Sequence, residues 1–99
     1  MMTWREIYER LNEIMRIHLK RSKEELWDPV KQLHMDIINA TAREKEYDQG
    51  LLYVGICLMI VLKAIDDMDW KLVNITLGLA LIYSWMRLQQ EGKEQGSGD

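Results

Sequence analysis

The chain has 99 residues, a formal charge of −3 and a single cysteine, Cys57. A chain of this length forms one small domain, and its slight acidic surplus argues against a general nucleic-acid binder, which needs a basic surface. The lone cysteine excludes an internal disulfide and a four-cysteine zinc site. With one proline, no phenylalanine and seven methionines, the composition favours long helices, and we expect an all-α protein of four helices.

Charge is distributed unevenly along the chain. Residues 1–48 carry nine basic and ten acidic side chains, whereas residues 49–99 carry four and six. Residues 49–62 contain no charged side chain, and neither do residues 72–86. The sequence therefore predicts a polar first half followed by an apolar second half.

Residues 1–48 have the pattern of an amphipathic helical hairpin. Thr3 and Glu6 match a capping box, which predicts a helix from Trp4 to about Leu26. Asp28 followed by Pro29 predicts the start of a second helix. Apolar positions recur every three or four residues in both helices. They are Trp4, Ile7, Tyr8, Leu11, Ile14, Met15 and His18 in the first, and Val30, Leu33, Ile37, Ala40, Thr41 and Tyr47 in the second.

Residues 49–91 have the pattern of a hydrophobic helical hairpin. Its first helix, about 51–65, is apolar on every side, with Gly50 as either a break or part of the helix. The turn at residues 66–69 is acidic, and Asp67 or Asp69 can cap the helix that follows. That helix is expected from Trp70 to about Gln90. Residues 92–99 are polar and glycine-rich, so we expect them to form a flexible tail.

A helix that is apolar on every side has to be surrounded by protein or by lipid. The two charged helices of this short chain cannot cover the second hairpin completely, so part of residues 51–62 would face outward in a monomer. Two interpretations follow. The chain is a small membrane-associated protein, or it is a soluble homo-oligomeric interaction or inhibitor module with residues 51–62 at the subunit interface.

Segment lengths and aromatic positions favour the membrane interpretation. The two apolar helices rise about 22 Å and 28 Å, against a hydrocarbon core of about 30 Å. Membrane-interface positions are predicted at Tyr53, Tyr83 and Trp85 on one side and at Trp70 and Lys63 on the other. Basic residues are more numerous at the ends of the hairpin than at its turn, so both termini are expected to be cytoplasmic. They are Arg43, Lys45, Arg87 and Lys93 at the ends, against Lys63 and Lys71 at the turn.

Both interpretations predict self-association through the second hairpin, with a bilayer or an unidentified protein as further partners. Small residues every four positions let helices approach closely. The expected contact residues are Leu51, Leu52, Gly55, Ile56, Met59, Thr76, Ala80 and Ser84. Exchanging Gly55 or Ala80 for Leu is then expected to disturb association more than exchanging Met59.

No residue pattern predicts catalysis, and we expect a non-enzymatic protein without a metal ion or cofactor. The acidic turn at 66–69 is more typical of solvated helix caps than of a cation site. His18 and His34 lie on different helices and are more typical of partly buried histidines than of a metal pair. Apolar neighbours of Cys57 are expected to raise the pKa of its thiol. A basic cluster at the end of the first helix either binds an anionic lipid surface or compensates the helix dipole; it comprises Arg16, His18, Lys20, Arg21 and Lys23.

One remote alternative rests on acidic motifs. Glu24, Glu25 and Asp28, followed by residues 46–53, resemble the EExxE and ExxD motifs of the all-α nucleotide pyrophosphatases, the MazG and dimeric dUTPase group. The resemblance implies carboxylates on facing helices that hold Mg²⁺ for pyrophosphate cleavage. Position 49 is Gln where the ExxD motif has an acid, and Pro29 interrupts the first motif, so no site is assigned to these residues.

Overall fold

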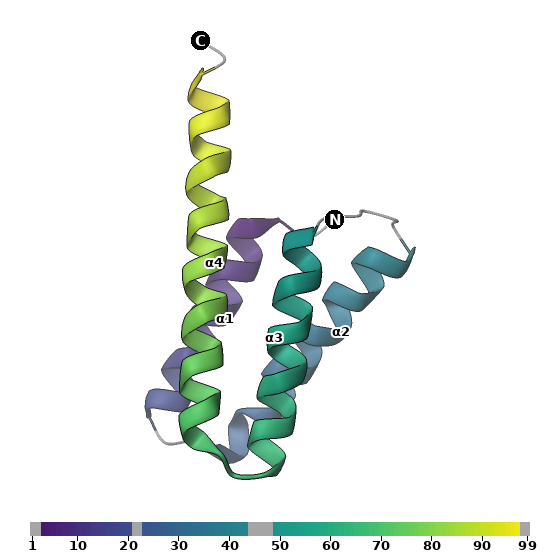
Figure 1. The fold of residues 1–99 in the computed structure, drawn as a ribbon, viewed down its shortest axis with the longest axis vertical. Coiled ribbons are helices and arrows are strands. Elements are labelled where there is room, and N and C mark those ends of the chain that lie inside the picture. The colour runs from purple at the N-terminus through teal and green to yellow at the C-terminus, as the bar shows by residue number, and fades with distance from the viewer. Residues whose placement is uncertain (1–2, 21–22, 44–48, 98–99) are drawn as a thin grey trace.

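A computed structural model describes residues 3–20, 23–43 and 49–97 of the chain. Over these ranges it contains four α-helices and no strand, which confirms the all-α prediction. The elements are α1 (Trp4–Leu19), a short 3-10 turn η1 (Lys23–Glu25), α2 (Trp27–Arg43), α3 (Gln49–Asp66) and α4 (Trp70–Ser97). α3 and α4 form one layer, and α1 and α2 pack against one side of it, α1 along α4 and α2 along α3 (Figure 1).

α1 begins where the capping residue predicts and ends earlier than expected. Thr3 Oγ1 accepts a hydrogen bond of 3.1 Å from the backbone N–H of Glu6. The helix ends at Leu19, not at about Leu26, and the N–H of Lys20 donates to the carbonyl of Arg16. A helix continued to Leu26 would carry that side chain about 10 Å beyond Leu19. The turn instead brings Leu26 into the core, where it is fully buried.

α2 begins at Trp27, two residues before the predicted Pro29. The carbonyl of Leu26 accepts the first hydrogen bond, 3.3 Å from the N–H of Val30. Pro29 lies in the first turn, where a missing N–H costs no hydrogen bond. Residues 44–48, including Tyr47, lie outside the described ranges.

The turn between α3 and α4 closes the apolar hairpin. The carbonyl of Ala64 accepts from the N–H of Asp69 at 2.8 Å, and that of Ile65 accepts from Met68 at 3.1 Å. This pair of bonds is a Schellman motif, which holds Met68 at a φ of 57°. Asp69 Oδ1 accepts a hydrogen bond of 3.3 Å from the N–H of Leu72, which confirms Asp69 as a cap of α4.

α4 continues past the end that the sequence predicts. Its assigned helix reaches Ser97 and not about Gln90. One glycine, Gly92, costs a helix only about 1 kcal/mol relative to alanine, and the Lys, Glu and Gln that follow are good helix formers. The side chains of residues 92–99 lie outside the described set, so their flexibility stays a prediction.

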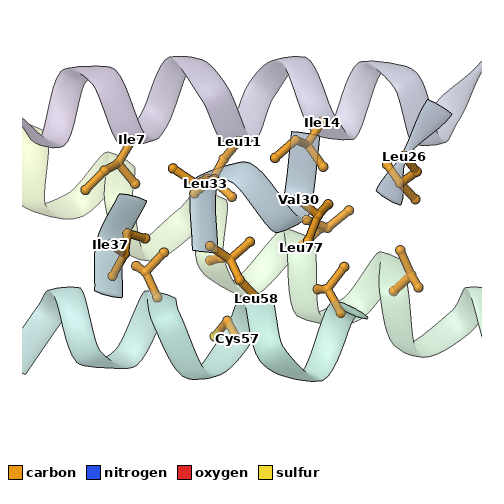
Figure 2. Packing of buried hydrophobic residues seen from close by; sticks show 14 of the residues in the cluster. Ile7, Leu11, Ile14, Leu26, Val30, Leu33, Ile37, Cys57, Leu58 and Leu77 are labelled. Atoms are coloured by element: carbon orange, nitrogen blue, oxygen red, sulfur yellow. The ribbon is translucent and has the colours of Figure 1, made fainter. Parts of the chain in front are cut away.

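The core lies between the two layers and receives side chains from all four helices (Figure 2). The buried positions of α1 and α2 match the predicted apolar stripes. Contacts between α1 and α2 include an ion pair, in which Arg10 Nη1 donates to Asp36 Oδ2 at 2.7 Å. The buried hydrophobic residues are Trp4, Ile7, Leu11, Ile14, Leu26, Val30, Leu33, Ile37, Ala40, Leu51, Val54, Cys57, Leu58, Val61, Ala64, Val73, Leu77 and Ala80.

Candidate functional site

The side of the α3–α4 layer that points away from α1 and α2 is apolar, and we call it the outer face. Its residues recur every three or four positions on each helix, opposite to the buried residues. No described element covers them. The outer face consists of Leu52, Ile56, Met59 and Ile60 on α3, and Leu72, Ile75, Leu79, Ile82 and Met86 on α4, each between 38% and 59% exposed.

The register of α3 and α4 makes this face continuous. The rings of Tyr53 and Tyr83 lie 4.7 Å apart, so the two helices are level at these positions. Because the helices run antiparallel, Ile56 is then level with Leu79 and Ala80. Residues 49–62 and 72–86 carry no charge, and the nearest charged pair at the turn end is Lys63 and Asp67, with Nζ 3.4 Å from Oδ1. The outer face is therefore one uncharged surface and not two separate stripes.

Three of the eight predicted self-association residues lie on the outer face: Leu52, Ile56 and Met59. The other five lie elsewhere. Gly55 faces α2, because a Cβ placed there would be 3.5 Å from Ile37 Cγ2. The remaining four are buried in the core of one copy: Leu51, Thr76, Ala80 and Ser84.

The small residues that were expected between two copies thus serve packing within one copy. Ser84 Oγ donates a hydrogen bond of 3.0 Å to the carbonyl of Leu81 in the same helix. Leucine at Gly55 or Ala80 would perturb the fold itself. A loss of association in Gly55→Leu or Ala80→Leu would therefore not distinguish a contact between copies from damage to the fold, because Ala80 is buried within one copy and Met59 is exposed.

The predicted membrane-interface aromatics lie at the two ends of the hairpin. Tyr83 packs edge-on against Trp4 of α1, with ring centroids 5.8 Å apart, and also contacts Tyr53. Trp85 is 48% exposed and lines a small groove of about 250 Å³ with Tyr8 and Asn12. At the turn end, the Lys23 ammonium lies 3.8 Å from the centroid of the Trp70 ring. Tyr83 and Trp70 therefore use their rings in contacts with the N-terminal half of the chain.

One helix within the described ranges, α3, is long and apolar enough to cross a membrane by length and composition, with 39% of that span buried in the bundle. The core helices of soluble proteins satisfy the same criteria. α1 and α2, which lie against the hairpin, carry charged outward side chains. A membrane-spanning hairpin would require both to separate from it, because charged side chains are costly in hydrocarbon.

The other sequence candidates do not come together. Among the described residues no three of His, Cys, Asp or Glu are close enough to hold a metal ion. Glu24, Glu25 and Asp28 are exposed, and residues 46 and 48 of the second acidic motif lie outside the described ranges. Burial raises the pKa of the Cys57 thiol, and a hydrogen bond to Tyr53 acts in the opposite direction. The direction agrees with the sequence prediction.

A second surface feature lies at the turn end of the molecule, where α1 and η1 meet the start of α4. It is an open groove of about 640 Å³, which we call the basal groove. Its described lining comes from residues 18, 19 and 23 and from four residues at the start of α4, which the packing of α1 on α4 brings together. The sequence predicted a basic cluster that includes His18 and Lys23 on one side of the groove. No sequence pattern indicated that residues at the start of α4 form the other side. The lining residues are His18, Leu19, Lys23, Trp70, Lys71, Asn74 and Ile75.

His18 is the buried titratable residue of this groove, only 8% exposed. Burial lowers the pKa of its imidazole, the nearby Lys23 ammonium lowers it further, and a hydrogen bond to the Asn74 side chain opposes both. Its Nδ1 has no hydrogen-bond partner among the described residues. Burial and the Lys23 ammonium therefore both disfavour the protonated form of His18.

The lowered pKa of His18 predicts that the fold is less stable in mild acid. Below the unfolded-state pKa of about 6.5, the unfolded chain binds a proton more readily than the folded chain, so the free energy of unfolding falls as the pH falls. The fall ends below the folded-state pKa. Urea titrations of the parent chain and of His18→Gln across this range should show a smaller pH dependence in the variant. Equal pH dependence in both would contradict the prediction.

Comparison of the chain with protein-family models, with curated proteins and with solved structures finds no match. The function has therefore to be argued from the surfaces of this fold, namely the outer face and the basal groove.

Proposed function

We propose that this chain is a non-enzymatic helical protein that self-associates, with the outer face of one copy packed against the outer face of a second copy. The observation that carries the proposal is the absence of charge across the nine residues of the outer face. For side chains of this size, these exposed fractions correspond to a surface of roughly 800 Å². This is about the area that each partner contributes to a stable interface of standard size. Exposed apolar patches of monomeric proteins are usually smaller, about 300–600 Å².

A second copy suits this face better than a bilayer surface does. Helices that lie in a membrane interface carry many Lys and Arg residues beside their apolar side. The flanks of the outer face offer Lys63 and Lys71 at the turn, together with Asp66, Asp67 and Asp69. Attraction to an anionic bilayer would therefore be weak there. Two apolar faces meeting about a twofold axis need no charge complementarity, because the same patch serves both copies.

The test is to place a charge in the middle of the outer face. Ile56→Lys and Leu79→Lys should each weaken self-association by roughly 30-fold or more, because a desolvated charge at an interface centre costs 2 kcal/mol or more. Sedimentation equilibrium in buffer without detergent measures the change. The matched control is Ile38→Lys on α2, which is 47% exposed and lies on the other layer. It should leave the association constant unchanged.

The outcome that would overturn the proposal is a parent chain that stays monomeric at high micromolar concentration. An equal loss of association in Ile38→Lys and Ile56→Lys would also overturn it, because the outer face would then have no special role. Far-ultraviolet circular dichroism checks that each variant remains helical.

A second candidate function, membrane association, is favoured by the apolar length of α3. Membrane association predicts a different result in cell fractionation from self-association in solution. The chain would sediment with membranes and leave the pellet only when detergent is added. Recovery of a monodisperse dimer from the soluble fraction favours self-association in solution over this candidate.

A further inference from the structure

The basal groove combines cationic, polar and apolar side chains. Lys23, Lys71, His18 and Asn74 are polar, and Leu19, Trp70 and Ile75 are apolar. Its volume of about 640 Å³ falls within the range of small-molecule sites, about 300–1,000 Å³. It lies at the end of the bundle and is distinct from the centre of the outer face, although Ile75 belongs to both.

The charge of the groove is positive. Neither Lys23 nor Lys71 forms an ion pair with a carboxylate among the described residues. Lys71 lies in the first turn of α4, and the Lys23 ammonium of η1 lies over the Trp70 ring at the same helix end, where the helix dipole favours a negative charge. Asp69, the acid nearest to Lys71 in sequence, uses Oδ1 to cap Leu72. Glu24, which follows Lys23, is exposed and is not among the residues that line the groove. These two ammonium groups, one of them stacked on the Trp70 ring, have no carboxylate partner among the described residues and so attract an anion.

His18 supplies an independent sign of a ligand. Its side chain lines the groove although the residue is nine-tenths buried, and its Nδ1 has no partner among the described residues. A buried polar atom without a hydrogen bond costs about 1–3 kcal/mol, and such an atom in a native fold calls for an explanation. A bound anion would provide one by favouring the imidazolium form, in which both ring nitrogens carry a proton, so that Nδ1 can donate to an anionic oxygen while the bond to Asn74 is kept.

We propose that the basal groove binds a phosphate group carried on an apolar body. Lys23 and Lys71 bind the phosphate oxygens, and His18 donates a hydrogen bond to the same group. The apolar body lies against Trp70 and Ile75. A soluble phosphate monoester and the headgroup of an anionic phospholipid share this chemistry. The proposal does not rest on self-association, because its polar residues Lys23, Lys71 and His18 lie outside the outer face and only Ile75 is shared.

Nuclear magnetic resonance of the full chain tests the proposal with three probes: inorganic phosphate, phenyl phosphate, and vesicles of phosphatidylcholine with or without phosphatidic acid. Phenyl phosphate should shift the ring signals of His18 and the indole N–H of Trp70 in a saturable way, and bind more tightly than inorganic phosphate. It should also raise the pKa of His18, because an anion stabilises the imidazolium. His34, on α2, serves as an internal control whose signals should not move.

Variants separate a built site from general attraction of anions. Lys71→Gln and Lys23→Gln should each weaken phenyl phosphate binding by roughly fivefold or more, whereas Lys31→Gln on the exposed side of α2 should not. Broadening of the Trp70 signal only by vesicles that contain phosphatidic acid would identify a lipid headgroup as the source. Absence of any response to all three probes, or an equal loss in Lys31→Gln and Lys71→Gln, would overturn the proposal.

Discussion

Exchanging Leu58 for alanine is expected to lower the free energy of unfolding by about 2–5 kcal/mol, whereas Met59→Ala changes it by less than about 0.5 kcal/mol in the monomer. The two residues are neighbours in α3. Leu58 is fully buried between the layers, and Met59 is 57% exposed on the outer face. Figure 2 shows Leu58 in the core together with labelled side chains of α1, α2 and α4. Truncation of Leu58 therefore leaves a cavity among these side chains. Truncation of Met59 leaves only a smaller exposed side chain.

Urea titration at low and high protein concentration measures both effects. The loss in Leu58→Ala should be similar at the two concentrations. The loss in Met59→Ala should grow with concentration, because self-association stabilises only the folded state and Met59 contributes to the proposed interface. A large loss in Met59→Ala at low concentration would mean that α3 is rotated, with its outer side in the core. That result would contradict both the fold and the outer face.

This contrast also explains how much of the fold the sequence could predict. α1 has one apolar side and one charged side, so its buried residues Ile7, Leu11 and Ile14 follow from spacing alone. α3 is apolar on every side, so no pattern separates Val54 and Leu58, which are buried, from Ile56, which is not. The sequence predicted that part of this helix stays uncovered. Only the packing of α1 and α2 determines which part.

The candidate sites show the same limit. The ridge of Thr76, Ala80 and Ser84 has the spacing of a contact between helices, and it is one, but within a single copy. Spacing does not distinguish an internal contact from an external one. The basal groove depends on residues some fifty positions apart in sequence, His18 and Lys71 among them. Such long-range proximity has no local signal in the sequence, so the spacing of residues indicated only the side formed by His18 and Lys23.

Exchanging Gly50 for alanine is expected to lower the free energy of unfolding by about 1–3 kcal/mol, the usual cost of overpacking a core. Gly50 lies in the first turn of α3, where the sequence alone left a break or a continuous helix open. An added Cβ would lie 2.8 Å from Trp4 Cζ2 and 2.8 Å from Tyr83 Oη. A contact this short requires the aromatic cluster to move. The cluster consists of Trp4 on α1, Tyr53 on α3 and Tyr83 on α4. Its displacement would loosen the end of the bundle that lies opposite the α3–α4 turn.

The matched control is the same exchange at Gly78, in the interior of α4. A Cβ there meets no atom within 4 Å, so Gly78→Ala should stabilise the fold by up to about 1 kcal/mol, the difference in helix propensity. The same chemical change is thus expected to have opposite signs at two positions. Stabilisation by both would show that Gly50 does not contact Trp4 in solution. Adding Trp4→Leu gives a second check in a double-mutant cycle, because removal of the large ring should reduce the cost of Gly50→Ala and leave only the contact with Tyr83 Oη.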